Sequence, residues 1–566
     1  MNVVCPNCGA ENRIPDPLEP NKKYRCGKCN FLLTVRAKPR LRHSKRTDRS
    51  YTIAKLMQVG NRVNLQLALA VLGFAAVGLV LLGTSRYGAG MSEDAIAYVT
   101  CATNLSEGGG YTCHYGTDDG VLYAYWPPLF PTLLAGLAKV GIDPLQGARL
   151  LNALAFGFIV FASGQLFRMF IRSTTLVILA TLLVLFSDIF HYSLFALTEP
   201  LFTLFCILFV IYLLKFLKAQ RPLFLLLASV FAALSFLQRY AGATTILVGV
   251  IVMISPLLMV PRMQRLKYAT IFGVISAIPC AVWMIRNYIL TSSLTGGVHT
   301  LTSPHSLSEN IEYAARNVAS WFYPPAYSGP TNVALVFAGV AGALFLIALI
   351  ASVRYKVKTG LDTTFARAWP VAIFVLVYTL WLIITATVVE FEHILNPRFL
   401  LPIYAFVILL VFIAIQNASN LLKRRWPRTQ VEYAVIAVCA LWLMSPLLSF
   451  SESALDHARY GVGWNSVAFR ESEVMEWVQT HELEGMIYSN APEQIYFVTG
   501  ITAKWSPYCS ADIHEFGRTI ASGNGSYLVW FNDLHVTWVH PFEELASELE
   551  MEEVAKVSDG GVYLLK

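Results

Sequence analysis

Long apolar runs separated by short polar connections dominate the chain between about residues 64 and 449. Each run is roughly 17–25 residues long, which is enough for a helix to cross a hydrocarbon core of about 30 Å. A backbone inside lipid must satisfy its own hydrogen bonds, so these runs are helical. The pattern predicts an α-helical polytopic membrane protein with about eleven transmembrane helices. The expected spans are 64–84, 147–167, 173–188, 199–217, 221–238, 241–259, 268–288, 332–352, 369–389, 398–417 and 430–449.

Composition agrees with the membrane class. The chain is 55% hydrophobic and 14% charged, with a mean hydropathy of +0.53, whereas a soluble protein carries about 25% charged residues. The net charge of +7 is modest. Its basic residues gather near the N-terminus and in short connections between apolar runs, which indicates membrane topology and no nucleic-acid partner.

The basic connections alternate along the chain. Counting from a cytoplasmic N-terminus, each inner connection is basic, as the positive-inside rule requires. The C-terminus is then extracytoplasmic, in a multi-pass protein of the inner (plasma) membrane. The large outer regions are the loops 86–149 and 287–331 and the tail 450–566. The inner basic residues are Arg168 and Arg172; Lys215, Lys218 and Arg221; Arg262, Arg265 and Lys267; Arg354, Lys356 and Lys358; and Lys423, Arg424, Arg425 and Arg428.

Two C-x₂-C pairs stand in the first 35 residues, Cys5 with Cys8 and Cys26 with Cys29. This spacing is typical of a zinc ribbon, in which four thiolates hold a structural Zn²⁺. The alternative is a disulfide or a redox dithiol. The segment 1–35 resembles small zinc ribbons at the N-termini of bacterial proteins. We predict a cytoplasmic ribbon that docks a cytoplasmic partner, followed by a basic linker at 36–63.

The tail 450–566 contains no spanning run. Amphipathic stretches alternate there with short apolar runs, a pattern that favours a small α/β domain outside the membrane. In the first outer loop, Cys101 and Cys113 share an oxidising compartment, so a disulfide between them is one hypothesis.

Acidic residues mark the outer ends of two spans. Glu93 and Asp94 open the first outer loop, where a carboxylate serves as a general base for a hydroxyl acceptor. The alternative is a helix N-cap, with Ser92 followed by acids in the first turn. Glu199, before Pro200, lies at the lip of a later span, where an acid is costly unless it faces a cavity or a partner. Its alternative is an acid solvated at a helix start.

Arginines on the outer side run against the charge rule. Arg239, Arg286 and Arg398 each lie at an outer span end. A planar guanidinium binds the oxygens of a phosphate ester bidentately, which suits a phosphate held at the membrane surface. The alternative for each is snorkelling to headgroups or pairing with Glu390 or Glu392.

Taken in order, four elements resemble the GT-C superfamily of membrane glycosyltransferases. They are Asp94-x-x-x-Tyr98, the Pro127-Pro128-Leu129-x-Pro131 segment, Glu199-Pro200, and the span start Pro397-Arg398-Phe399-Leu400-Leu401-Pro402. The resemblance covers roughly residues 64–450. It is to the bacterial branch similar to protein O-mannosyltransferases and to the lipid A aminoarabinose transferase. Known members lack the N-terminal ribbon.

The resemblance implies a hexosyl or pentosyl transferase. It would move a sugar from a polyprenyl-phosphate donor to a lipid, glycan or protein acceptor. Asp94 would be the general base, with Glu93 beside it. Glu199 would orient the acceptor or bind a divalent cation, Mg²⁺ or Mn²⁺. Arg239 and Arg398, joined by Arg286, would hold the donor phosphate.

Two other classes compete with the enzyme. A secondary transporter or lipid flippase carries ionisable groups near the bilayer midplane, whereas the acids here lie at span ends. A membrane sensor could use the ribbon and the outer domain, but it would not need so many spans.

Overall fold

The computed structural model describes residues 2–566 except 5–9, 14–23, 30–31, 34–46, 116–117, 259, 297–305, 323–338, 340–349, 352–353, 355–363, 389–396, 522–524, 535 and 537. The chain forms two compact units, residues 1–65 and 66–566. In the first unit, β1 (Asn2–Val4) pairs antiparallel with β2 (Glu11–Arg13), and β3 (Tyr24–Arg25) with β4 (Leu32–Leu33). Each C-x₂-C pair therefore falls, in sequence, between two paired strands.

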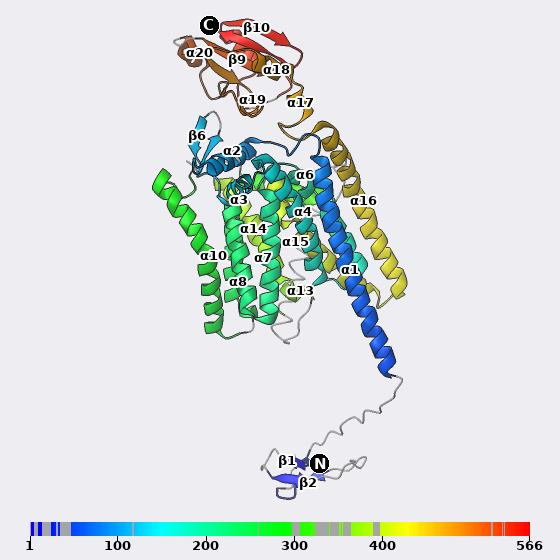
Figure 1. The fold of residues 1–566 in the computed structure, drawn as a ribbon. Helices are drawn as coiled ribbons and strands as arrows, with labels where there is room; N and C mark the ends of the chain where they lie inside the picture. The colour runs from blue at the N-terminus through cyan, green and yellow to red at the C-terminus, as the bar shows by residue number, and fades with distance from the viewer. Residues whose placement is uncertain are drawn as a thin grey trace. The chain divides into compact units, whose positions relative to one another are not determined.

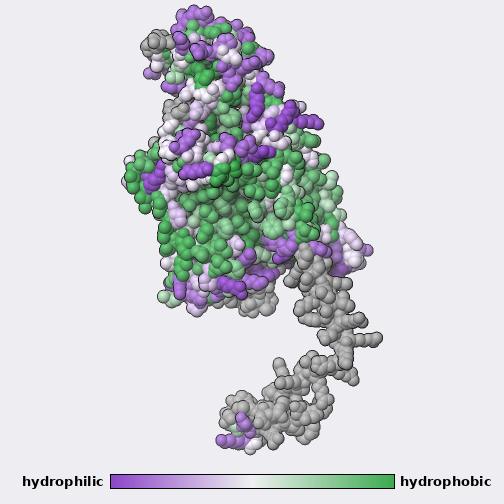
Figure 2. Space-filling model, in the orientation of Figure 1, coloured by the Kyte–Doolittle hydropathy of each residue, from purple (hydrophilic) through white to green (hydrophobic). Residues whose placement is uncertain are grey.

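The second unit is a bundle of apolar helices followed by a small sheet domain (Figure 1). Its sides are covered by hydrophobic residues, with hydrophilic residues at its ends (Figure 2). The bundle elements are α1 (Thr47–Gly83, which begins in the first unit), α2 (Glu93–Glu107), β5 (Thr112–Tyr115), β6 (Asp118–Leu122), α3 (Leu129–Ala138), α4 (Pro144–Arg168), α5 (Thr174–Leu185), α6 (Ile189–Ser193), α7 (Glu199–Ala219), α8 (Pro222–Gln238), η1 (Tyr240–Gly242), α9 (Ala243–Ile254), η2 (Pro256–Leu258), α10 (Arg262–Thr291), α11 (Leu307–Ser320), α13 (Thr364–Arg367), α14 (Trp369–Val388), η3 (Pro397–Leu400), α15 (Leu401–Leu422) and α16 (Arg428–Tyr460).

The predicted helical membrane architecture is confirmed. Among the described residues, seven helices are long and apolar enough to cross a membrane, and α5, α8 and α9 are shorter apolar helices. Every predicted span corresponds to one of these helices except 332–352, most of which lies outside the described residues. The structure shortens 241–259 to Ala243–Ile254, because Ser255-Pro256 cannot continue the helix.

Burial separates central helices from peripheral ones. The apolar stretch of α7 is 78% buried, and those of α15 and α4 are 72% and 67% buried. The stretch of α16 is only 11% buried. Where α1 crosses α4, glycines allow the backbones to meet: a Cβ added at Gly157 would lie 2.7 Å from the Gly73 carbonyl oxygen. Small residues permit such close approach between membrane helices.

The segment between α1 and α4 folds over one end of the bundle. Helix α2 ends at Gly108, whose φ of 92° is open to glycine at little cost. The β5–β6 hairpin follows it. Cys101 on α2 and Cys113 on β5 are both buried free thiols, so the structure contains no disulfide between them. Burial raises the pKa of Cys113 to about 12.

The tail forms the predicted α/β domain. A five-stranded sheet has the order β10-β11-β9-β7-β8, with β7 parallel to both β8 and β9 and the other pairs antiparallel. Apolar cores on its two faces are covered by α18 and α19 and by α20 and α21. The elements are α17 (Val467–Arg470), α18 (Glu473–Thr480), β7 (Met486–Ser489), α19 (Pro492–Thr499), β8 (Lys504–Trp505), α20 (Ile513–Ala521), β9 (Ser526–Phe531), α21 (Phe542–Glu548), β10 (Met551–Val557) and β11 (Gly560–Leu565).

This domain contacts the same end of the bundle that carries α2. The rings of His114 on β5 and Tyr496 on α19 stack with centroids 3.5 Å apart. The Asn465 Nδ2 donates a hydrogen bond of 2.8 Å to the Ala89 carbonyl oxygen. Residues just before α2 are thus fixed to the start of the C-terminal domain.

Candidate active site

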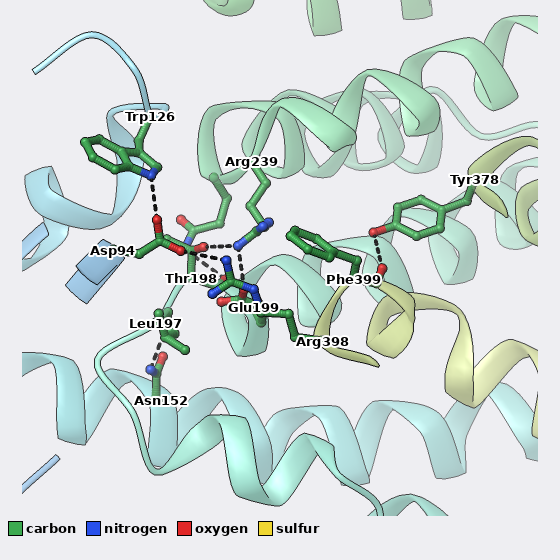
Figure 3. A network of polar contacts seen from close by, with 11 residues as sticks. Asp94, Trp126, Asn152, Leu197, Thr198, Glu199, Arg239, Tyr378, Arg398 and Phe399 are labelled. Carbon is green, nitrogen blue, oxygen red and sulfur yellow. Dashed lines mark hydrogen bonds and ion pairs between the residues drawn. The ribbon is translucent and has the colours of Figure 1, made fainter. Parts of the chain in front are cut away.

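Four charged residues from separate segments meet beside α2 (Figure 3). Asp94 lies in the first turn of α2, and Glu199 is the first residue of α7. Arg239 lies between the end of α8 and the start of η1. Arg398 lies in η3, ahead of α15. Each residue stands at a helix end, so the fold of the bundle brings together residues about 300 positions apart in the sequence.

Ion pairs connect the four side chains. Arg239 Nη1 lies 2.6 Å from Glu199 Oε1, and Arg398 Nη2 lies 3.0 Å from Asp94 Oδ2. The Arg398 Nε is also 3.7 Å from the same Glu199 oxygen. Two guanidinium groups therefore balance two carboxylates. Because each ion has a partner of opposite charge, the desolvation cost of placing four charges at this end of the bundle is reduced.

The two carboxylates are exposed to different degrees. The Glu199 side chain is 2% exposed, and the Asp94 side chain is 21% exposed. Glu199 also shares its arginine with Thr198, whose Oγ1 accepts a 2.8 Å hydrogen bond from Arg239. Asp94 is therefore the more accessible of the two carboxylates, and Glu199 is the more deeply buried one.

Two aromatic side chains position Asp94. The Trp126 Nε1 donates a 3.0 Å hydrogen bond to Asp94 Oδ1. Tyr98, one helical turn after Asp94, packs edge-to-face against Trp126 with ring centroids 5.9 Å apart. Burial raises the pKa of Tyr98 well above its usual value, and the negative charge of Asp94 raises it further. Tyr98 therefore remains a neutral hydrogen-bonding group and does not act as a base.

Arg398 and Arg239 share an aromatic neighbour. The guanidinium carbons lie 4.9 Å and 5.5 Å from the ring centroid of Phe399. The Phe399 carbonyl oxygen accepts a 2.9 Å hydrogen bond from Tyr378 OH on α14. On the opposite side, Asn152 Nδ2 donates to the Phe195 and Leu197 carbonyl oxygens and fixes the backbone that leads to Glu199. The cluster rests on rigid helices, which suits a site that needs fixed geometry.

The other candidate residues lie apart from this cluster. Glu93 is exposed to solvent. Arg286 on α10 donates a 2.9 Å hydrogen bond to the Tyr123 carbonyl oxygen and lies over the Trp283 ring. Its recorded contacts are with the first loop and with its own helix α10, and not with Asp94 or Glu199. Glu390 and Glu392 lie outside the described residues.

Trp126 and Thr198 are site residues that the sequence reading did not single out. Each directly precedes a motif named in the sequence, Trp126 before Pro127 and Thr198 before Glu199. Their positions next to these motifs were the signal that could have found them. The residue type of Trp126 gave none, because a tryptophan in an outer loop is normally an interfacial anchor.

The described residues do not by themselves form a divalent cation site at Asp94. Within the described part of the chain, no group of three His, Cys, Asp or Glu side chains converges. The Arg398 guanidinium lies within ion-pair distance of both carboxylates, 3.0 Å from Asp94 and 3.7 Å from Glu199.

The N-terminal thiols fit a structural Zn²⁺ as far as they are described. Cys26 is buried, and its Sγ accepts a 3.5 Å hydrogen bond from the Lys28 backbone N–H. A backbone donor to sulfur two residues earlier is the arrangement that stabilises a metal-bound thiolate. Cys29 is also described, whereas Cys5 and Cys8 lie outside the described residues.

Comparison with solved structures finds the same fold elsewhere. ArnT from Cupriavidus metallidurans in the apo state matches with a TM-score of 0.55 and 12% identity, covering 87% of this chain and 97% of that one. The same protein bound to undecaprenyl phosphate matches with a TM-score of 0.52, at the same identity and coverage. No protein-family model and no curated protein matches the chain. The fold expected from the resemblance is confirmed.

Proposed function

We propose that this protein is a membrane glycosyltransferase that uses a polyprenyl-phosphate-linked sugar donor. The observation that carries the proposal is the joining of Asp94 and Glu199 to Arg239 and Arg398 at one end of the bundle. A carboxylate for proton removal and guanidiniums for a phosphate are the groups that this transfer requires. The shared fold supports the donor class, because one of the similar structures is described as bound to undecaprenyl phosphate.

Arg398 is the residue that joins donor binding to catalysis. Arg398 pairs with Asp94 at 3.0 Å. A donor phosphate offers two oxygens in the geometry that the guanidinium fork prefers. As the phosphate takes over Arg398, Asp94 loses its ion pair and gains a free oxygen for the acceptor hydroxyl. Donor binding thereby activates the base, and the site stays neutralised until a donor arrives.

The transfer is a displacement at the anomeric carbon of the donor sugar. The acceptor oxygen forms a bond to that carbon and gives its proton to Asp94. The bond between the carbon and the phosphate oxygen breaks, and its electron pair stays on the departing polyprenyl phosphate. Arg398 and Arg239 stabilise the charge that develops there, because their guanidinium groups are already held in place before the reaction.

Glu199 has a positioning role in this scheme. Its Oε1 lies within ion-pair distance of both arginines, so it keeps the two guanidiniums close despite their mutual repulsion. The Trp126 indole N–H orients Asp94 through Oδ1.

The remaining parts of the proposal follow from the charge pattern. The Asp94 end of the bundle and the C-terminal domain face outward, and the N-terminus with its Zn²⁺ ribbon lies in the cytoplasm. The acceptor is a lipid, glycan or protein of the cell envelope that carries the accepting hydroxyl.

The test compares Asp94→Asn with Glu107→Gln, an exposed acid at the far end of the same helix. Envelope glycans and glycolipids from cells carrying each variant are profiled by mass spectrometry. Loss of a general base costs about 10²–10⁴-fold in rate, so the product of Asp94→Asn falls below detection while that of Glu107→Gln stays normal. A product made normally by Asp94→Asn refutes Asp94 as the base.

A lipid-binding measurement distinguishes residues that act in the chemical step from residues that bind the donor phosphate. Purified Asp94→Asn binds undecaprenyl phosphate at least as tightly as the unmodified protein, because Arg398 no longer has a competing carboxylate. Arg398→Gln weakens the same binding by about tenfold or more. Equal binding by Arg398→Gln and the unmodified protein contradicts the phosphate role of that arginine.

A further inference from the structure

A cavity of about 210 Å³ opens beside the bundle, and residues other than the Asp94 cluster line it. Its walls come from the turn after α1, the first turns of α4, and the segment that leads into the C-terminal domain. The lining residues are Thr84, Ser85, Arg86, Tyr87, Gly88, Leu145, Gln146, Arg149, Asn465 and Arg470.

The charge of this cavity is one-sided. Three lining residues are arginines, Arg86, Arg149 and Arg470, and no lining residue is acidic. The nearby Asp143 is the N-cap of α4, and its Oδ1 accepts hydrogen bonds from the backbone N–H groups of Leu145 and Gln146. The Asp94 cluster balances its arginines with carboxylates, whereas this cavity does not.

The recorded hydrogen bonds of these arginines, within the described part of the chain, all go to neutral oxygens. Arg149 donates to Thr84 Oγ1 at 2.8 Å and to the Leu81 carbonyl oxygen at 2.8 Å. Arg470 donates to Asn465 Oδ1 at 2.6 Å and to the Tyr87 carbonyl oxygen at 3.2 Å. These bonds fix the guanidiniums in place but leave their positive charges uncompensated.

Arg86 has no structural task comparable to theirs. It is exposed, and its recorded contact is with the Tyr87 ring, 5.0 Å from the guanidinium carbon to the centroid. The Arg470 guanidinium lies 6.0 Å from the same ring. Two cations beside one aromatic ring and a third, Arg149, in the same cavity lining repel one another. An anion between them removes this repulsion and uses the donors that remain on each fork.

The level of the cavity along the membrane normal indicates which kind of anion it can bind. The candidate span of α1 ends at Gly83, immediately before the lining residue Thr84, and the span of α4 begins at Pro144. The cavity therefore lies where two spans leave the hydrocarbon, at the level of lipid headgroups. The phosphate of a lipid headgroup at this level presents anionic oxygens, which guanidinium groups bind through paired hydrogen bonds.

We propose that this cavity is a phosphate-anion site, separate from the catalytic cluster, and that it takes the phosphate of a lipid headgroup or a free phosphate. Its occupant joins three parts of the chain: Arg86 after α1, Arg149 on α4, and Arg470 at the start of the C-terminal domain. The bound anion thereby holds that domain to the bundle. This goes beyond the transfer reaction, because the site carries no group for chemistry.

The test measures binding by calorimetry to the full-length protein in a neutral detergent. The probe is dihexanoyl phosphatidic acid, a soluble lipid with a phosphate headgroup. Every protein carries Arg398→Gln, which weakens phosphate binding at the catalytic cluster by about tenfold or more and does so equally in each protein compared. The failure of this proposal is then distinguishable from a failure of the proposed function.

The decisive variant adds Arg86→Gln and Arg470→Gln, both exposed positions. Each lost charge-assisted contact weakens binding by about tenfold, so the pair weakens it by about a hundredfold. The matched control adds Arg424→Gln and Arg425→Gln, exposed at the opposite end of the bundle, and binds as before. If the double change unfolds the protein, Arg86→Gln alone retains a tenfold effect.

A competition arm identifies the source of the anion. Inorganic phosphate that displaces the probe at similar concentration indicates a soluble anion, and phosphate that fails to displace it indicates a lipid headgroup. Hydrogen exchange of residues 84–88 and 465–470 slows when the probe binds. Equal affinity in the decisive variant and its parent overturns the site, and so does the absence of binding by both probes.

Discussion

At the scale of single residues, the two ion pairs of the site have different tasks. Glu199 is 2% exposed, and its Oε1 lies 2.6 Å from Arg239 Nη1. Asp94 and Arg398 are 21% and 24% exposed, and their pair spans 3.0 Å. A buried pair resists exchange because either ion alone would be stranded in a low dielectric. In a partly exposed pair, such as Asp94 with Arg398, either ion can give up its partner for a charged group of a ligand. Glu199 and Arg239 therefore form the fixed part of the site.

Removing the charge of Glu199 should destabilise the whole protein. Glu199→Gln leaves Arg239 without its anion, and breaking a buried pair costs about 3–5 kcal/mol. Because Arg239 is 17% exposed, we expect a value at the lower end, roughly 3 kcal/mol. Thermal unfolding in detergent measures the loss. The double variant Glu199→Gln/Arg239→Gln should recover part of it, since no unpaired charge remains. A double variant no more stable than the single one would contradict this account.

At the scale of elements, the sequence predicted helices well and contacts poorly. The apolar run 199–217 became α7 at Glu199–Ala219, because Pro200 stands at the helix start and no breaker interrupts the run. The charge pattern placed Asp94, Glu199, Arg239 and Arg398 at outer span ends, and the family resemblance assigned them to one site. Nothing in periodicity tells which helix ends meet. Arg286 followed the same charge argument and yet contacts the first loop, since helix rotation decides where a terminal side chain points.

A contact between α6 and α16 should respond to acid. His191 Nδ1 and His457 Nε2 lie 2.7 Å apart, so one ring donates to the other and both cannot be protonated there. Burial, and then the nearby His457, lowers the pKa of His191 from 6.5 to about 4. The unfolded chain takes up the proton near pH 6.5 and the folded chain only near pH 4. Stability is therefore complete above pH 6.5 and falls as the pH drops toward 4, by about 2–3 kcal/mol.

Unfolding measured across this pH range checks the contact. His191→Gln keeps a neutral hydrogen-bonding side chain and removes the titration. Its stability should change less between pH 6.5 and 4 than that of the unmodified protein. Parallel curves for the two proteins would show that another group causes the acid sensitivity.

At the scale of the whole molecule, the two units differ in how their folds are stabilised. The bundle and the α/β domain each bury large apolar clusters. The hydropathy of the sequence was sufficient to predict the bundle. In the described part of the N-terminal unit ahead of α1, the regular structure is short paired strands, β1 with β2 and β3 with β4. Segments this small seldom fold without a metal or disulfides. Cysteine spacing was therefore the only signal in the sequence that could explain its fold.

The ribbon should hold one Zn²⁺ per chain and fold only with it. Metal content measured by mass spectrometry on purified protein should give one equivalent, and Cys26→Ser should remove it, because a tetrahedral site needs all four thiolates. Chelation should then open residues 1–35 to proteolysis while the fragment from the bundle onward stays intact. The cluster around Asp94 belongs to a unit with its own core, so its undecaprenyl phosphate binding should not change. Metal-free protein with a protease-resistant N-terminus would show that the thiols serve a different purpose.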